Sequence, residues 1–125
     1  MKKIIQTRNT PKPVGPYSQA MRVDKFLFVS GQVAMDPKEG KIVAKDIRKQ
    51  TAKVLENIKA ILQSADYNLS DIVQSNVYLS SMAMFNEFNT EYAKYFGKEY
   101  PTRATMGIEL MPGALVEISA IAYKD

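Results

Sequence analysis

Two charged residues stand in strand-like stretches that are otherwise apolar or small, and their types could do chemistry. Glu117 lies within ALVEISAIAY, where burying a carboxylate is costly unless it is paired or hydrogen-bonded. Arg103 follows Pro-Thr in another strand, and a guanidinium can hold an anion with two parallel hydrogen bonds. Each also has a structural explanation. Glu117 could lie at a sheet edge or subunit rim beside water or a Lys, and Arg103 could be an exposed strand residue or the partner of Glu117. Together they indicate a site that binds an anion and moves a proton.

Three other places carry residues that could belong to such a site. Asn89 interrupts an aromatic helical stripe, where an amide more often satisfies backbone groups. Tyr17 follows a Gly-Pro pair that constrains its ring, although core packing is the commoner role of such a tyrosine. Ser30 and Gly31 end a strand, and a glycine there permits close approach of a ligand or a plain bulge. The residues alone leave both roles open at each place.

The composition limits the chemistry further. The chain has no Cys and no His, which excludes disulfides, thiol nucleophiles, a Ser–His–Asp triad and His-ligated zinc. Acid–base steps must therefore use other side chains or backbone groups, and no metal site is expected. The net charge of +4, from scattered lysines, slightly favours anionic small molecules and forms no stripe typical of nucleic-acid binding.

The length of 125 residues suits a single domain spanning residues 1–125. The N-terminus carries two lysines without an apolar segment after them, which does not resemble a secretory signal. No apolar run approaches the roughly 20 residues needed to cross a bilayer. We therefore expect a cytoplasmic protein with no membrane partner.

Five stretches are expected to be strands, and two amphipathic segments are expected to be helices. The strands are residues 17–23, 26–30, 72–80, 102–108 and 115–123, the first two forming a hairpin across Asp24-Lys25. In the third strand, Val73, Val77 and Leu79 would share one face. Asp46 can cap a helix to about residue 65. Ser81 can cap a second helix with an aromatic stripe, ended by Gly97.

This order predicts an α+β fold in which two helices pack on one face of a single sheet. The last strand is apolar on both faces, with Ile121 and Tyr123 on one and Val116 and Ile118 on the other. Two helices can cover only one of these faces. We therefore expect the second face to be buried by self-association, as a ring of subunits.

Five short motifs, in order and at fitting spacings over residues 4–123, resemble those of the RidA/YjgF family. They are Gly15-Pro16-Tyr17-Ser18-Gln19-Ala20, Ser30-Gly31-Gln32, Asn89-x-x-Tyr92, Pro101-x-Arg103 and Glu117-Ile118-x-Ala120-Ile121-Ala122. The resemblance implies a chorismate-mutase-like (bacillary type) fold and a homotrimer with sites between adjacent subunits. It also implies hydrolysis of short reactive 2-imino acids, 2-iminopropanoate and 2-iminobutanoate, to 2-keto acids and ammonia, with no cofactor.

The resemblance also implies residue roles. Arg103 would bind the substrate carboxylate, Glu117 would position or activate the attacking water, and Tyr17 would hydrogen-bond near the reacting carbon. The other candidates for substrate contact are Ser30, Gly31, Asn89 and Thr105. Two positions depart from the pattern of many members, which have Cys in place of Thr105 and an acidic residue in place of Ser119. These departures leave the preferred imine side chain open.

Three other functions compete with deamination. A regulator that binds 2-keto acids through Arg103 would use the same cleft without turnover. RNA cleavage, an activity also attributed to parts of the family, has little support because the chain lacks His and a basic stripe. Chorismate mutase activity would need a more cationic site for a dicarboxylate, and only Arg103 among the arginines has a site-like setting. Deamination is the function that the motifs favour.

Overall fold

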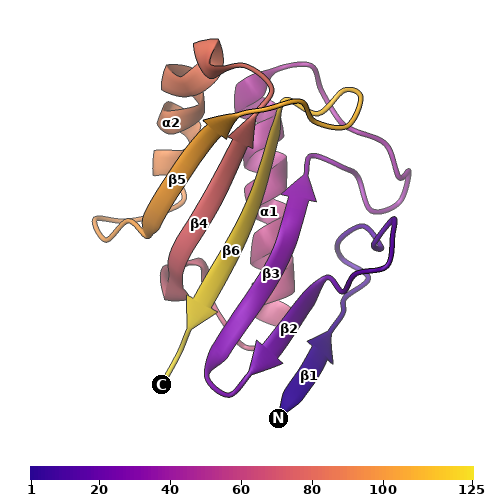
Figure 1. Cartoon of the computed structure of the whole chain (residues 1–125), viewed down its shortest axis with the longest axis vertical. Helices are drawn as coiled ribbons and strands as arrows, with labels where there is room; N and C mark the ends of the chain where they lie inside the picture. The colour runs from indigo at the N-terminus through magenta and orange to yellow at the C-terminus, as the bar shows by residue number, and fades with distance from the viewer.

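A computed structural model describes residues 1–125 as one mixed sheet with both helices behind it (Figure 1). The strands are β1 (Lys2–Ile5), β2 (Ala20–Val23), β3 (Phe26–Val33), β4 (Ile72–Leu79), β5 (Thr102–Gly107) and β6 (Val116–Tyr123). Their order across the sheet is β1-β2-β3-β6-β4-β5, and only the β4–β5 pair is parallel. The helices are α1 (Ile47–Ser64) and α2 (Phe85–Ala93). The predicted α+β fold is confirmed.

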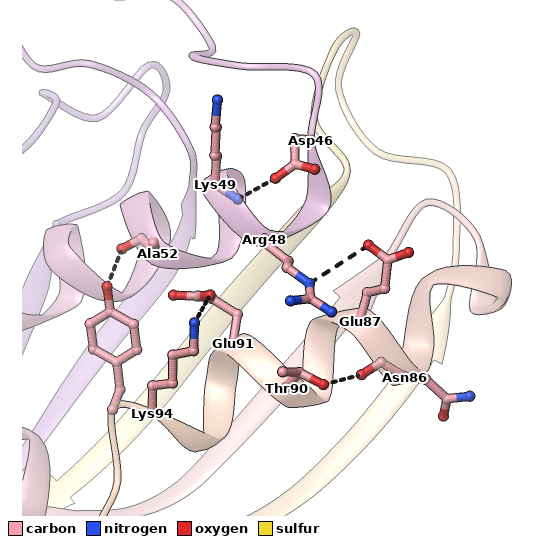
Figure 2. Close-up of polar contacts among 10 residues, drawn as sticks. Asp46, Arg48, Lys49, Ala52, Asn86, Glu87, Thr90, Glu91 and Lys94 are labelled. Carbon is pink, nitrogen blue, oxygen red and sulfur yellow. Dashed lines mark hydrogen bonds and ion pairs between the residues drawn. The ribbon is translucent and has the colours of Figure 1, made fainter.

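Helix α1 begins and is buried as its sequence predicts. The Asp46 carboxylate accepts a hydrogen bond from the Lys49 backbone N–H at 2.9 Å, as Figure 2 shows, which satisfies a donor left unpaired at the first turn. The apolar stripe of the helix, including Val54, Ile58 and Ile61, lies in the core. Neither helix is long and apolar enough to cross a membrane.

Alternation along β6 divides the sheet into two environments. Val116, Ile118, Ala120 and Ala122 are buried against the helices. The residues between them face the other side, where Phe28 of β3 pairs with Ile121 and Phe26 with Tyr123. Both phenylalanines are more than 40% exposed, at 41% for Phe26 and 43% for Phe28. An apolar sheet face without a covering layer is therefore present, and its burial by self-association stays a prediction.

Two strand predictions need correction. The N-terminal strand β1 was not expected, because only Ile5 of its four residues is buried and no alternation marks it. The hairpin strand begins at Ala20 instead of Tyr17. The Gln19 carbonyl still accepts a bond from the Ser30 backbone N–H, but the Gln19 side chain is used to hold the preceding loop.

Two further predictions fail for local reasons. A bulge between Ile72 and Gln74 turns Val73 away from the face of Val77 and Leu79. Ser81 caps a short 3₁₀ turn, Met82–Met84, which leads into α2. The helix ends at Ala93, since the backbone N–H groups of the next two residues bond three residues back, so Gly97 is not its terminator.

Candidate active site in two halves

A cleft of about 490 Å³ lies between the proline-rich segment before β2 and the end of β3. Four of the residues singled out from sequence line it together: Tyr17, Ser30, Gly31 and Glu117. Tyr17 is 47% exposed, which contradicts a role in core packing.

The wall that carries Tyr17 is held by a residue that sequence reasoning missed. Gln19 is buried, and its amide nitrogen donates to the carbonyls of Pro11 at 2.8 Å and Thr7 at 3.2 Å. Its amide oxygen accepts from the Thr7 backbone N–H at 2.8 Å. The Ser30 hydroxyl donates to the Ser18 carbonyl at 2.6 Å and ties the same segment to β3. The only signal in the sequence was the place of Gln19 within the first family motif.

Gly31 is required by the approach of Glu117. A Cβ at position 31 would lie 2.3 Å from Oε2 of Glu117 and 2.9 Å from its Cδ. The carboxylate therefore lies directly over the Gly31 backbone, at a bulge where the β3–β6 register shifts. Of the two roles left open for this glycine, close approach of another group is the one observed.

The electrostatic setting of Glu117 suits proton transfer. Burial raises the pKa of the Glu117 carboxyl above its usual value, because a partly desolvated carboxylate is less stable than a hydrated one. Neither ion pair of the chain involves Glu117. A carboxyl group in this state exchanges protons closer to neutral pH than an exposed one.

Arg103 lies on β5 within a second cleft, of about 340 Å³, that Asn89 and Tyr92 of α2 also line. Its Nη2 donates to Oδ1 of Asn89 at 2.8 Å. Its guanidinium carbon is 4.9 Å from the ring centre of Tyr92 and 5.4 Å from that of Phe88, which are cation–π distances. Asn89 therefore orients Arg103. The role expected from its sequence context was a different one, the satisfaction of backbone groups.

Helix α2 is itself fixed against α1, so the position of Asn89 is set by the helix pair. Arg48 of α1 faces Glu87 of α2 (Figure 2), with its Nε 3.8 Å from Oε2 of the carboxylate. The Tyr95 hydroxyl donates a hydrogen bond to the Ala52 carbonyl at 3.4 Å. From within the core, the Ser75 hydroxyl lies 2.8 Å from that of Tyr92. The arginine thus rests on a packed aromatic support.

The two clefts lie on opposite faces of the sheet. Arg103 pairs in register with Ser75 of β4, whereas Glu117 pairs with Tyr78 of the same strand. Residues an odd number of positions apart on a regular strand point to opposite faces. Arg103 therefore shares the helix-covered face with Thr105, and Glu117 lies on the open face. One chain does not bring Arg103 and Glu117 together, so the alternative that they form an ion pair with one another is wrong.

No group of three or more His, Cys, Asp or Glu residues is arranged to hold a metal ion. One cleft contains the Arg103 guanidinium, and the other contains the Glu117 carboxylate and the Lys12 side chain. Such a set can bind a carboxylate and transfer a proton to or from water.

Comparison with known proteins agrees with the motifs. The family model described as Endoribonuclease L-PSP matches residues 7–124. The chain belongs to the RidA/YjgF family. A RutC family protein of Pyrococcus horikoshii is 51% identical over the full length of both chains. The human 2-iminobutanoate/2-iminopropanoate deaminase is 34% identical, over 99% of this chain and 91% of that protein. YyfA of Yersinia pestis, a Rid-family protein, has a TM-score of 0.95 at 40% identity, with 99% of this chain and 100% of that chain covered.

Proposed function

We propose that this Rid-family chain is a cofactor-independent deaminase. It hydrolyses short 2-imino acids, such as 2-iminopropanoate and 2-iminobutanoate, to 2-keto acids and ammonia in the cytoplasm. The observation that supports the proposal is that Arg103 and Glu117 lie on opposite faces of the sheet, so that each cleft holds only one of the two groups that the reaction needs. Human and bovine relatives that carry the deaminase name support the same chemistry.

The half-sites become one site when a second copy of the chain is added. We propose a homotrimer in which Arg103 of one copy faces the Glu117 cleft of its neighbour. The apolar open face, with Phe26 and Phe28 exposed, provides surface that association would bury. Cyclic symmetry would repeat the same heterologous contact at each interface, so that three equivalent sites form.

In the assembled site, Arg103 would hold the substrate carboxylate with two hydrogen bonds. Its cation–π support and its bond to Asn89 fix the guanidinium before substrate arrives. Fixing the carboxylate orients the imine carbon, which converts hydrolysis into a reaction between held partners. The backbone around Thr105, on the same face, and that of Gly31 would complete the contacts.

Glu117 would carry the proton steps. Its carboxylate takes a proton from water as the water oxygen bonds to the imine carbon, and gives that proton to the imine nitrogen, which yields a tetrahedral carbinolamine. It then takes the remaining hydroxyl proton and gives it to the amino nitrogen, so that the carbon–nitrogen bond breaks, ammonia leaves and the carbon–oxygen double bond of the 2-keto acid forms. Tyr17 lines the same cleft and its hydroxyl would hydrogen-bond near the reacting carbon. The raised pKa of Glu117 favours both transfers.

The test measures ammonia and pyruvate release from 2-iminopropanoate made in situ by an amino-acid oxidase. Wild type should accelerate release, Arg103→Ala should lose most of that acceleration, and Arg22→Ala at an exposed position of β2 should retain it. If wild type binds 2-oxobutanoate but hydrolyses no imine, the chain is a 2-keto acid binder and the deaminase proposal is wrong.

A further inference from the structure

Another cleft, of about 640 Å³, adjoins the Glu117 cleft and differs from it in chemical character. It lies between residues 6–14 and the turn at residues 35–40. Three cationic side chains line it, those of Arg8, Lys12 and Lys38, against one carboxylate, that of Glu39. Both ion pairs of the chain involve other residues. The lining of the cleft therefore carries a net positive charge, and none of its three cations forms an ion pair with a carboxylate.

The wall of this cationic cleft is fixed by buried contacts. The carbonyls that Gln19 binds belong to Thr7 and Pro11, the neighbours of Arg8 and Lys12. The two cations therefore extend from a backbone that is already ordered. Thr10, also in the lining, is 2% exposed and its hydroxyl has no hydrogen-bond partner. A buried polar group without a partner is rare.

The Glu117 cleft and the cationic cleft adjoin at Lys12. This residue lines both of them, together with Pro11, Val14 and Met35. A ligand held beside Glu117 that extends along the proline-rich segment would therefore meet Lys12 at the border of the cationic cleft. The Glu117 cleft alone, at about 490 Å³, falls in the range that accepts drug-sized ligands.

We propose that the cationic cleft binds a distal carboxylate at the end of the substrate side chain, so that dicarboxylic 2-imino acids are substrates beside the short aliphatic ones. This rests on the proposed function of the Glu117 cleft. Lys12 is the specificity-determining residue, since it stands where the clefts join, and Arg8 and Lys38 add to the positive field. Arg103 holds the carboxylate next to the imine carbon, and Lys12 holds the one at the far end.

The test measures binding of the 2-keto acid products by calorimetry at 150 mM salt, which screens charges that are far apart. Each dicarboxylate is compared with a monocarboxylate of the same carbon number, which lacks only the distal charge: 2-oxoglutarate with 2-oxopentanoate, and 2-oxoadipate with 2-oxohexanoate. In the pair whose chain is long enough to reach Lys12, the dicarboxylate should bind about tenfold more tightly than its matched partner ligand. Lys12→Met should bring that ratio close to one. The same substitution on the exposed face of α1, Lys49→Met, should leave the ratio unchanged.

Equal affinities within both pairs for the wild type would overturn the proposal, and so would a preference that survives Lys12→Met as fully as Lys49→Met. Because binding is measured instead of turnover, failure of the deaminase chemistry does not obscure the result. If all four keto acids bind equally, only the distal subsite is wrong. If none binds, the proposed function is wrong as well.

Discussion

Replacing Gly31 with alanine should misplace Glu117 while leaving the fold intact. The added Cβ would lie 2.3 Å from Oε2 of Glu117, where ordinary contact begins at 3.4 Å, so the carboxylate must move by about 1 Å. The backbone at position 31 is not in the left-handed region, since only Gly40 and Gly113 among the glycines have positive φ. Alanine is therefore allowed by the backbone and excluded only by the carboxylate.

The size of the effect follows from that displacement. A shift of about 1 Å in a catalytic group can reduce a rate by about 100-fold. We expect Gly31→Ala to lower kcat/KM for 2-iminopropanoate by about this factor. The unfolding temperature should change little, because the displaced atoms are the end of one half-buried side chain. The assay is initial-rate ammonia release, with thermal unfolding measured on the same preparations.

The matched control is Gly97→Ala, because a Cβ at position 97 meets nothing within 4 Å. Its kcat/KM should equal that of the wild type. If Gly31→Ala retains full activity, the Glu117 carboxylate does not need the position seen in the structure. Its role as the group that moves protons would then be refuted.

Three further substitutions test other parts of the site and fold. Glu117→Gln should lower kcat by about 100-fold or more. Burial raises the pKa of Glu117, so ionisation of this carboxyl destabilises the wild-type fold as pH rises from acidic to neutral. The variant should lack this contribution, which thermal unfolding of both proteins across that pH range measures. Asn89→Ala removes a hydrogen bond to the charged Arg103 guanidinium, and should lower kcat/KM by about tenfold with an unchanged pH profile. Ala44 has a left-handed φ of 62°, so Ala44→Gly should raise the free energy of unfolding by about 1 kcal/mol, measured by urea denaturation.

Local patterns were enough to predict most of the fold. The apolar stripe of α1 and the Asp46 cap lie within one helix, so their signals are contiguous in sequence. The failures occur where long-range pairing overrides the local pattern. Val73 alternates correctly with Val77, but a bulge in β4 reverses its face. The strand β1 exists because β2 offers an edge to pair with, and its four residues carry no pattern of their own.

The candidate site was predictable in its residues and not in its arrangement. Tyr17 and Glu117 were singled out individually, and they line one cleft. Their separation from Arg103 depends on strand register, because Ser75 and Tyr78 of β4 pair with residues on opposite faces. Register is set by contacts between distant segments. The role of Gln19 was hidden for the same reason, since its partners at Thr7 and Pro11 lie in an irregular loop.

The claim that one active site is shared between two copies of the chain can be tested by subunit mixing. Arg103→Ala and Glu117→Gln should each be nearly inactive when purified alone. When the two are co-expressed in equal amounts, random assembly places an intact Arg103 beside an intact Glu117 at about one quarter of the interfaces. We expect imine hydrolysis to return to about a quarter of the wild-type rate. Activity in the mixture no higher than that of the separate variants would contradict the shared site.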